Sequence, residues 1–563
     1  MTTHSELKAN LLMRVPGSSR TLIPLLDASD THAPQGGDHA LTEHLTMRRM
    51  SAGPWRRWLV AVGLGAAIAL SASVTAFARI AVDPSDGGGG GDGGPPADPP
   101  PAADSRVDNA PAEGGGWQHA HGSSTNTGFA KVDTAPAASH RPFTYLGAIA
   151  PGANPVVGPN GDVYIGNMQG ELRAFRADGT PYWTRQINGM HGGIFAAPVV
   201  GNDGSIYVVS SIHDANLKRN DSFLHKFSAG GAWVFAMPFP EHGGYLSGSR
   251  PADGGATTAP PNIWRANATE AIMVPVVYPG NWGKKDLRLL AFSTGGTVLG
   301  DNMVTQAPSP ETTGGSKIFD YFTECYPYGC SFKGTPAFPF PEADWQLPGV
   351  AIRPDPQGGA PLVMVTDGRQ DKIAYAFSPQ SGFSQVARSK HTLRTFTTPP
   401  VVQGNGNTVT GTLDGYLTFT GRNFAQLPAV GGLGTLTAAP TRLPDGRLIV
   451  ISREGRISAL SGGNVIWQSQ LVGKSIASAA ASCTYFFVST SDEFVTFDSK
   501  TLLPVAKLAW IGGGLSSPVI GSGGYVYAIA SDSLFVFAPP LYSRGITACD
   551  LPTTRPGGGV LSQ

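Results

Sequence analysis

The stretch PVVGPNGDVYIGNMQGELRAFRADGTPYW, from Pro155 to Trp183, carries the pattern that decides the fold. It contains short runs of β-branched and aromatic residues, which favour strands. Asn160-Gly161 supplies the positive φ angles of a tight hairpin turn between two of these runs. Degenerate copies of the phrase return until the end of the chain, beginning at or near Pro155, Pro198, Pro260, Pro336, Pro400, Pro440, Ala479 and Pro518.

The eight copies are spaced like single four-stranded units, at about 40 residues where no insertion intervenes. Sheets of this kind bury their faces against their neighbours around a common axis. We therefore predict an all-β fold, an eight-bladed β-propeller of four-stranded blades over residues 117–540. Small residues (Ala174, Ala459, Gly166) would let the sheets approach closely. The Trp that ends a copy is expected to cover the gap between blades, at Trp183, Trp233 and Trp467.

The two ends of the repeat region are expected to meet in one blade. The last copy ends at Pro539 with too few strands, whereas HRPFTYLGAI, residues 140–149, precedes the first copy. An open sheet edge is an aggregation hazard, so a blade built from both ends of the chain is favoured. We predict that residues 143–149 pair with the last copy near residues 526–537.

The first 116 residues do not carry the repeat. Residues 1–55 have no apolar periodicity, which indicates a disordered cytoplasmic segment or a start codon assigned too early. Within the segment 56–80, residues 58–78 hold no charge over 21 positions, enough for a single hydrophobic helix to span a bilayer. Residues 81–116 are a Gly/Pro-rich linker, and residues 541–563 form a C-terminal tail.

The apolar segment predicts export of the ring. Arg48, Arg49, Arg56 and Arg57 precede it, which places the amino terminus in the cytoplasm. Ala76-Phe77-Ala78 is a small-x-small pattern typical of signal-peptidase cleavage. A retained membrane anchor and a signal cleaved after Ala78 both remain open. Either one puts the propeller outside the cytoplasm, in the periplasm, at the cell exterior or secreted.

Charge and cysteine content restrict the partners. The formal net charge is zero and only 14% of residues are charged, which gives no basic footprint for nucleic acid. Four cysteines in an exported chain favour disulfides. Cys325 is expected to pair with Cys330 across a short turn, and Cys483 with Cys549 to fasten the tail. The alternative is a reactive or metal-binding thiol pair, although no Cys-x-x-Cys is present.

The copy from Pro155 and the copy PTRLPDGRLIVISREGRISALSGGNVIW from Pro440 resemble the repeats of the pyrroloquinoline-quinone (PQQ)-type, quinoprotein alcohol dehydrogenase-like β-propellers. The opening Trp117-Gln118-His119-Ala120-His121-Gly122, followed by Asn126-Thr127-Gly128, is similar to the first strand of such rings. The resemblance implies an eight-bladed fold. The family includes quinoprotein dehydrogenases and also non-enzymatic relatives, such as an outer-membrane assembly lipoprotein.

For the dehydrogenase branch, the resemblance implies a cofactor stacked between a Trp and a disulfide of adjacent cysteines, with calcium held by acidic and amide groups. The sequence has no adjacent cysteine pair and no Asp/Asn cluster with calcium-loop spacing. We therefore expect no cofactor. PQQ with calcium belongs to the alternative, because sugar-oxidising quinoproteins also lack the pair. Lone acidic residues that would face the channel, or simply form turns, are Asp253, Asp367, Asp371 and Asp414.

Two further features offer sites. His191 and His242 each precede Gly-Gly, so they are candidates for a metal or an acid/base pair, or for packing over a glycine turn. The insertion 305–344 is rich in aromatic residues of the kind found at interfaces: Phe319, Tyr321, Phe322, Tyr326 and Tyr328. The sequence thus favours a non-catalytic binding or scaffold protein at the cell envelope, with a protein or envelope component as partner. The alternatives are a PQQ-dependent oxidoreductase and a carbohydrate-binding propeller.

Overall fold

The structure is a computed structural model, and it describes most of the chain from Trp117 onward. The described residues belong to the second of two compact units, Pro96–Gln563. The segments 1–55, 56–80 and 81–116 lie outside them. Within the described part of the chain, no helix is long and apolar enough to cross a membrane. The described residues are 117–141, 143–187, 192–214, 219–242, 254–279, 285–307, 322–326, 329–332, 349–355, 359–368, 370–391, 395–539 and 549.

Short strands joined by turns build every blade. Blade 1 consists of β2 (Val156–Val157), β3 (Val163–Gly166), β4 (Glu171–Phe175) and β5 (Pro181–Gln186). In blade 2, β6 (Gly193–Ile194) and β7 (Val199–Val200) both pair with β8 (Ile206–Asp214), which is followed by β9 (Arg219–Phe227) and β10 (Trp233–Pro238). Blade 3 consists of β11 (Asn262–Ala266), β12 (Thr269–Pro279), β13 (Lys285–Ser293) and β14 (Val298–Ala307). Blade 4 consists of β17 (Ala351–Arg353), β18 (Leu362–Thr366), β19 (Asp371–Ser378) and β20 (Gly382–Lys390).

The second half of the ring repeats this arrangement. Blade 5 consists of β21 (Val401–Val402), β22 (Thr408–Gly411), β23 (Leu417–Thr420) and β24 (Gln426–Val430). Blade 6 consists of β25 (Thr441–Arg442), β26 (Leu448–Ile451), β27 (Arg456–Ser461) and β28 (Asn464–Gln470). Blade 7 consists of β29 (Ala480–Ala481), β30 (Tyr485–Ser489), β31 (Glu493–Asp498) and β32 (Pro504–Ala509). Blade 8 consists of β33 (Val519–Ile520), β34 (Val526–Ala530), β35 (Ser533–Phe537) and β1 (Thr144–Tyr145).

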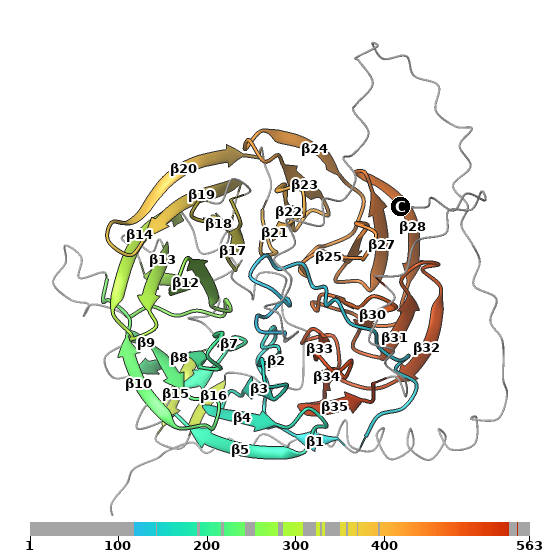
Figure 1. The fold of residues 1–563 in the computed structure, drawn as a ribbon, viewed down its shortest axis with the longest axis horizontal. Helices are drawn as coiled ribbons and strands as arrows, with labels where there is room; N and C mark the ends of the chain where they lie inside the picture. Colours follow the sequence, from blue (N-terminus) through green and yellow to red (C-terminus); the bar gives the residue numbers. More distant parts are fainter. Residues whose placement is uncertain are drawn as a thin grey trace, which may run out of the picture. The chain divides into compact units, whose positions relative to one another are not determined.

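Eight antiparallel sheets surround one axis, which confirms the predicted all-β propeller (Figure 1). In blades 1 to 7 the first strand lies nearest the axis and the last lies at the rim. The inner strands therefore all begin at one face of the ring, which we call the upper face, and end at the lower face. A separate hairpin, β15 (Phe322–Tyr326) with β16 (Gly329–Phe332), comes between blades 3 and 4 in the chain but lies against β8 of blade 2.

The ring is closed by strand β1, as the sequence predicts. Thr144 pairs with Leu534 and Tyr145 with Ser533, so β1 becomes the outer strand of the last blade. The contact continues on both sides, because Arg141 N donates to Val536 O and Leu146 N donates to Asp532 O. The last copy thus gains its fourth strand from the chain segment before the first copy, and no blade is left incomplete.

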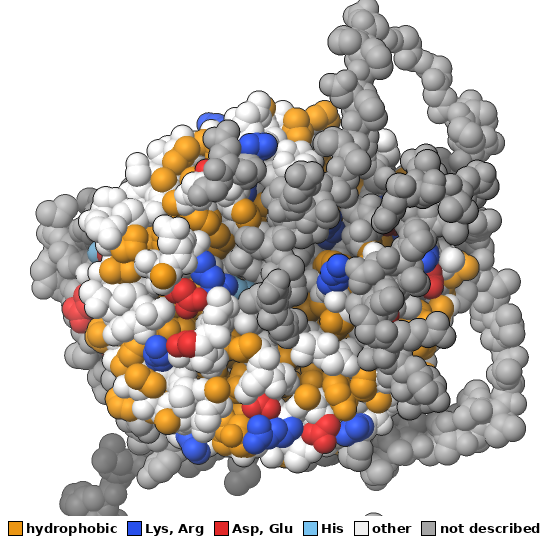
Figure 2. Space-filling model, viewed as in Figure 1, with side chains coloured by type: hydrophobic (Ala, Val, Ile, Leu, Met, Phe, Trp, Pro, Cys, Tyr) orange, Lys and Arg blue, Asp and Glu red, His pale blue; other side chains and the backbone are white. Residues whose placement is uncertain are grey.

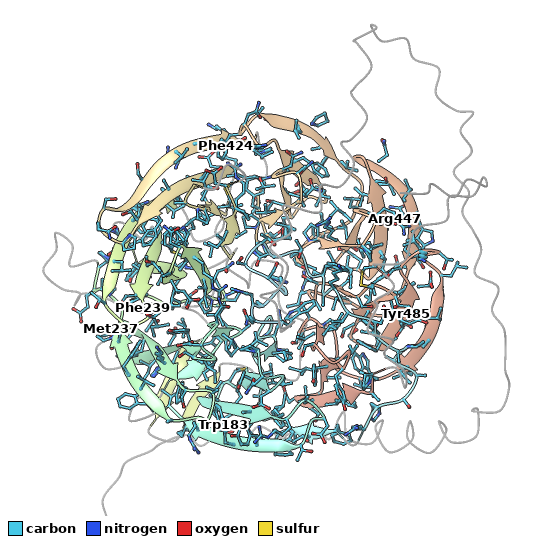
Figure 3. The ribbon with its side chains drawn as sticks, viewed as in Figure 1. Trp183, Met237, Phe239, Phe424, Arg447 and Tyr485 are labelled. Atoms are coloured by element: carbon cyan, nitrogen blue, oxygen red, sulfur yellow. A yellow bond between two sulfur atoms is a disulfide. The ribbon has the colours of Figure 1, made fainter. Side chains whose placement is uncertain are left out.

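Adjacent blades approach closely where one of them carries a small residue. A Cβ atom at Gly166 would lie 2.2 Å from Cγ2 of Ile194, so only glycine fits between blade 1 and β6. Trp183 lies opposite Ala174 in its own sheet and donates from Nε1 to Ala229 O of blade 2, at 3.1 Å. This tryptophan closes the gap at the rim between blades 1 and 2 (Figure 3).

The other two tryptophans differ from one another. Trp467 lies opposite Ala459 and packs edge-on against Phe497 of blade 7, with ring centroids 5.9 Å apart. Trp233 is 45% exposed, and the register of β10 shifts between Trp233 and Phe235. The last strand of blade 1 has the same shift, so Phe235 lies at the position that Trp183 has in blade 1. The Phe235 ring lies against Gly296 of blade 3. Phe235, rather than Trp233, therefore covers this gap.

Polar side chains fill the interface between blades 4 and 5. Lys372 of β19 is 2% exposed, and its Nζ donates to Thr418 O of β23 at 2.9 Å. Burial lowers the pKa of Lys372 well below its ordinary value of 10.5, because the charged amine loses its hydration. The other buried polar residues of this interface are Thr366, Ser389, His391, Thr408, Thr410 and Thr420.

Replacing Lys372 with methionine is expected to stabilise the protein at neutral pH, because a thioether chain is buried at less expense than an amine. The unfolded chain binds the proton up to its ordinary pKa of 10.5, whereas the folded amine releases it at lower pH. Wild-type stability should therefore rise as the pH approaches 10.5, and Lys372→Met should remove part of that rise. Urea unfolding at neutral and at alkaline pH measures both effects.

Lys226→Met is the matched control for this substitution. Lys226 Nζ also donates to a backbone carbonyl, Thr294 O at 3.1 Å, but Lys226 is only partly buried. The control should leave the pH dependence unchanged. If the unfolding free energy of wild type and of Lys372→Met depended equally on pH, the lowered pKa of Lys372 would be contradicted.

Candidate functional site at the ring axis

The axis of the ring is occupied by the chain's own N-terminal segment, Trp117–Val132, which we call the axial segment. Inner strands present one edge to the axis, and their N–H groups there need acceptors. Carbonyl groups of the axial segment supply these acceptors in ring order. The backbone pairs are Val157 N to Trp117 O, Val200 N to Gln118 O, Ile352 N to Ser124 O, Val402 N to Thr125 O, Arg442 N to Thr127 O and Ala481 N to Gly128 O.

Blade 3 joins the same arrangement through a side chain. Asn262 Nδ2 of β11 donates to Ser124 O at 3.0 Å. The axial segment is therefore bonded to the inner strands of seven of the eight blades. Figure 1 shows the segment before β1 at the centre of the ring, from where it runs outward to β1 at the rim.

Asn126 holds blades 4 and 5 to the axial segment. Its Nδ2 donates to Val350 O at 2.9 Å and to Pro400 O at 3.0 Å, and the residue is 4% exposed. Its φ angle of 61° lies in the left-handed region, which asparagine tolerates better than most residues. Both the amide group and the backbone conformation thus favour asparagine at this position.

A small cavity remains on the axis above this segment. Its volume is about 20 Å³, roughly the space for one water molecule. Residues that precede the inner strands line it, together with His121 of the axial segment. Among the described residues, the hydroxyls of Thr437 and Ser478 in this lining have no hydrogen-bond partner, and both residues are buried. The cavity therefore suits a neutral hydrogen-bonding group of about the size of water.

The two histidines of the axial segment are held in their neutral form. Burial lowers the pKa of His121 to about 4. Burial and then the positive charge of Arg265 lower the pKa of His119 well below its ordinary value, opposed by a hydrogen bond with Asn262. At neutral pH the His121 imidazole offers one donor and one acceptor to the cavity, and no charge.

The described residues at the axis do not fit PQQ with calcium. The cofactor is a large planar polycarboxylate, whereas the cavity has the size of a water molecule. Its lining contains no Lys, Arg, Asp or Glu that would pair with carboxylates or hold a cation. In the described part of the chain, no group of three His, Cys, Asp or Glu residues is arranged to bind a metal.

The acidic and histidine candidates do not meet at one place. His191 and Asp253 lie outside the described residues. His242 Nε2 lies 2.5 Å from Asp301 Oδ2, and Arg288 Nε donates to the other carboxylate oxygen of Asp301 at 2.6 Å. This cluster belongs to blade 3, away from the axis.

The three remaining acidic candidates have structural contacts. Asp367 accepts hydrogen bonds from the backbone N–H groups of Gln370 and Asp371. Asp371 forms an ion pair with Arg388 at 3.3 Å. Asp414 accepts a hydrogen bond from the Thr412 hydroxyl. The turn-forming interpretation therefore describes Asp367 and Asp414.

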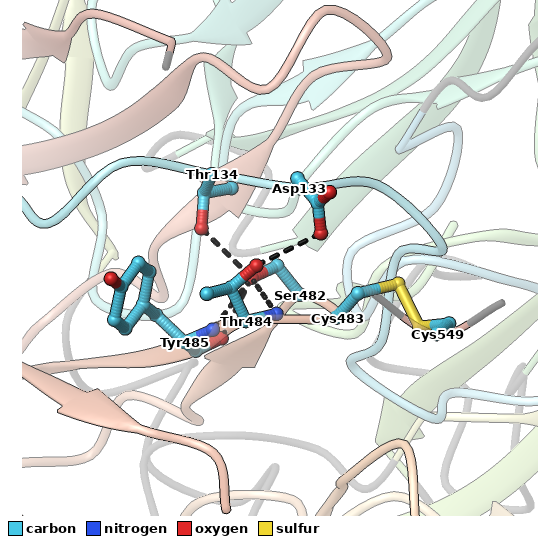
Figure 4. The surroundings of a disulfide bond; sticks show 7 residues. All are labelled: Asp133, Thr134, Ser482, Cys483, Thr484, Tyr485 and Cys549. Carbon is cyan, nitrogen blue, oxygen red and sulfur yellow. Dashed lines mark hydrogen bonds between the residues drawn. A yellow bond between two sulfur atoms is a disulfide. The ribbon is translucent and has the colours of Figure 1, made fainter. Parts of the chain in front are cut away.

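A disulfide joins Cys483 to Cys549, with Cα atoms 5.1 Å apart (Figure 4). The axial segment passes the same point. Cys483 N donates to Val132 O, and the Thr484 hydroxyl donates to Asp133 at 2.9 Å. The bond therefore fastens the C-terminal tail to the turn after β29, where the N-terminal segment leaves the axis.

The aromatic insertion is described only in part. Phe322 and Tyr326 belong to β15, whereas Phe319, Tyr321 and Tyr328 lie outside the described residues. Cys325 and Cys330 are opposite each other in the β15–β16 register. A bond between these two cysteines stays a prediction.

The sequence pattern does not predict the axial site. Trp117–Gly122 resembles only the opening strand of such a ring, and no motif marks His119, His121, Thr437 or Ser478. The available signal was a polar, glycine-containing segment with no strand pattern immediately before the closing strand.

No family model matches the chain, and no curated protein matches it in sequence. Among solved structures, BamB from Moraxella catarrhalis is similar at 14% identity and a TM-score of 0.44, covering 72% of this chain and 98% of that one. A europium-containing methanol dehydrogenase is similar at 11% identity and a TM-score of 0.40, covering 75% and 91%. The C-terminal WD40 domain of Sif2 is similar at 11% and 0.46, covering 73% and 99%. Likeness at this level carries no argument about function, and the fold assignment rests on the chain's own sheet topology.

Asn126→Ala is expected to lower the free energy of unfolding by about 3 kcal/mol, since two buried carbonyls lose their donor. Urea unfolding measures the change. Asn126→Gly separates the two contributions, because glycine accepts the positive φ angle but still lacks the amide. Ser139→Ala, an exposed change in the same N-terminal region, is the control. A decrease in unfolding free energy below about 0.5 kcal/mol for Asn126→Ala, as is typical of surface sites, would contradict a role of Asn126 in holding blades 4 and 5 to the axial segment.

Removing the Cys483–Cys549 bond is expected to destabilise the ring by at most about 4 kcal/mol, from the entropy of a loop with a sequence separation of 66. The double variant Cys483→Ser/Cys549→Ser should melt at a lower temperature than wild type under oxidising conditions. Wild type in reducing agent should approach the melting temperature of the variant. If calorimetry gives one melting temperature in all three cases, the bond does not stabilise the fold.

Proposed function

We propose that the chain is an exported, non-catalytic β-propeller that binds a protein or another component of the cell envelope. The observation that carries the proposal is the occupied axis. Carbonyl groups of the axial segment accept hydrogen bonds from inner-strand N–H groups around the ring. The remaining cavity has about the size of one water molecule, and its lining is uncharged. A propeller whose centre is filled in this way has its outer surfaces left for recognition.

Export is supported by two features of the chain. Residues 58–78 are uncharged and long enough to cross a membrane. The Cys483–Cys549 disulfide suits an oxidising compartment. We propose either a retained anchor or a signal cleaved after Ala78, with the ring outside the cytoplasm in both cases.

The upper face is the proposed partner surface. Trp117 bonds to the last residue of β2, and Cys549 is joined to Cys483 just after β29, so both described ends of the ring lie toward the lower face. A tether attached there would leave the upper face accessible. The β15–β16 hairpin, which lies against β8 of blade 2, is the proposed contact element.

The rival function, a PQQ-dependent oxidoreductase, is tested directly. The purified chain is incubated with PQQ and calcium, and both cofactor absorbance after desalting and dye-linked turnover of alcohols and sugars are measured. We expect neither retained PQQ absorbance nor turnover above background, because the axial cavity does not match the size or the carboxylates of the cofactor. A PQQ-dependent dehydrogenase loaded in parallel controls the assay. Turnover above background would overturn the proposal in favour of the oxidoreductase.

The partner surface is tested with the double variant Phe322→Ala/Tyr326→Ala. Cross-linking in intact cell envelopes should capture less partner than wild type, while the melting temperature stays nearly constant, because the hairpin stands apart from the eight sheets. Trp233→Ala is the matched control, since it removes an exposed aromatic from the rim of blade 2. Equal capture by the hairpin variant and the control would place the contact elsewhere.

A further inference from the structure

Two arginines from neighbouring blades meet at the lower end of blade 5. Arg353 is the last residue of β17 in blade 4, and Arg422 is the second residue of the turn between β23 and β24. Arg353 Nη1 donates to Arg422 O at 3.1 Å. Arg353 is 8% exposed, whereas Arg422 is exposed. One guanidinium group is therefore built into the ring and the other is open to solvent beside it.

The turn that follows β21 supports both this pair and a third arginine. The Arg422 backbone N–H donates to the Asn407 side chain at 3.0 Å, and the Arg422 chain packs over Gly406. On the other side of the same turn, the guanidinium group of Arg442 lies against Gly404. Three blades thus contribute one arginine each to the surroundings of residues 403–407.

The positive charges of Arg353 and Arg422 lie close enough to act on each other. Among the described contacts, no ion pair joins a carboxylate to either guanidinium group, although the charge of Asp355 also acts on Arg353. Burial and then the charge of Arg422 lower the pKa of Arg353, which means that its charged form is disfavoured there. By contrast, ion pairs with described carboxylates are formed by Arg141, Arg173, Arg176, Arg265, Arg288, Arg388 and Arg447.

The geometry of Arg353 is fixed by an aromatic ring. Its guanidinium carbon lies 4.3 Å from the ring centroid of Phe424, which Figure 3 labels. Phe424 has a φ of 67°, an unfavourable backbone conformation for a bulky side chain. The corresponding turn of blade 1 has the same hydrogen bonds and a positive φ at Gly179, so this conformation belongs to the repeated hairpin. The ring of Phe424 holds the guanidinium group of Arg353 in place.

We propose that Arg353 and Arg422, with Arg442 nearby, bind the phosphate group of a ligand at the lower face of blade 5. Guanidinium groups recognise phosphate through paired, charge-assisted hydrogen bonds. A bound oxyanion would form the ion pair with Arg353 and Arg422 that no described carboxylate forms. Figure 2 shows charged side chains of both signs scattered over the visible face, so general surface charge does not account for the site. The phosphate belongs either to a free phosphomonoester or to a lipid headgroup.

The test measures binding to the full chain in a neutral detergent, at constant ionic strength set with chloride. One arm titrates inorganic phosphate, and the other titrates glycerophosphoglycerol, the headgroup of an anionic phospholipid. Calorimetry should detect saturable binding in at least one arm. Stronger binding of phosphate indicates a phosphomonoester, and stronger binding of the phosphodiester indicates a lipid.

Arg422→Gln should weaken the binding about tenfold or more, because it removes charge-assisted hydrogen bonds from an exposed position without disturbing the core. Arg456→Gln is the matched control: it removes the same charge from another exposed residue, whose Nη1 donates only to Gly432 O among the described contacts. The control should bind like wild type. Absence of saturable binding in both arms, or an equal loss in the two variants, would overturn the proposal.

Discussion

The free inner edge of each blade is the constraint on which the rest of the structure depends. An inner strand bonds on one side to its own sheet, and its other edge points to an axis that offers no neighbouring strand. Carbonyl groups of the axial segment, from Trp117 to Gly128, accept hydrogen bonds there from blade after blade. The segment thus replaces the water or ligand that would otherwise satisfy these groups. A central site and a stable centre compete for the same atoms, and in this chain the centre is filled.

The same segment connects the centre with the closure of the ring. After leaving the axis beside Cys483, the chain runs outward and supplies β1 to the last blade. One continuous stretch therefore bonds to the inner strands and also covers the sheet edge that the last copy leaves open. The Cys483–Cys549 disulfide fastens the tail near the point where this stretch turns outward. Both described ends of the propeller are thereby coupled to one region of the ring.

The interfaces between blades are not equivalent. At the interface between blades 1 and 2, the ring of Trp183 packs against Gly231 of blade 2. Between blades 4 and 5, Lys372 is buried among hydroxyl groups, which places a desolvated amine where other interfaces have packing. At the lower end of the same interface, Arg353 of β17 is also buried, and it donates to Arg422 O of blade 5. Lys372 and Arg353 thus lie on the face of the blade 4 sheet that is turned to blade 5, and this interface buries two cations.

The repeated phrase by itself determined the fold class, the number of blades and the strand that closes the ring. These features follow from local patterns, namely short β-branched runs, Asn-Gly turns and a missing strand after Pro539. Phe235 rather than Trp233 covers a blade interface, because the last strand of blade 2 has the same bulge as that of blade 1 and Phe235 takes the position of Trp183. Tertiary structure alone decided three features. These are the filled axis, the neutral state of His121, and the contact of the Arg353 guanidinium group with the Arg422 carbonyl. Each of them depends on contacts between residues far apart in the chain, because burial and charge proximity arise only when the blades assemble around the axis.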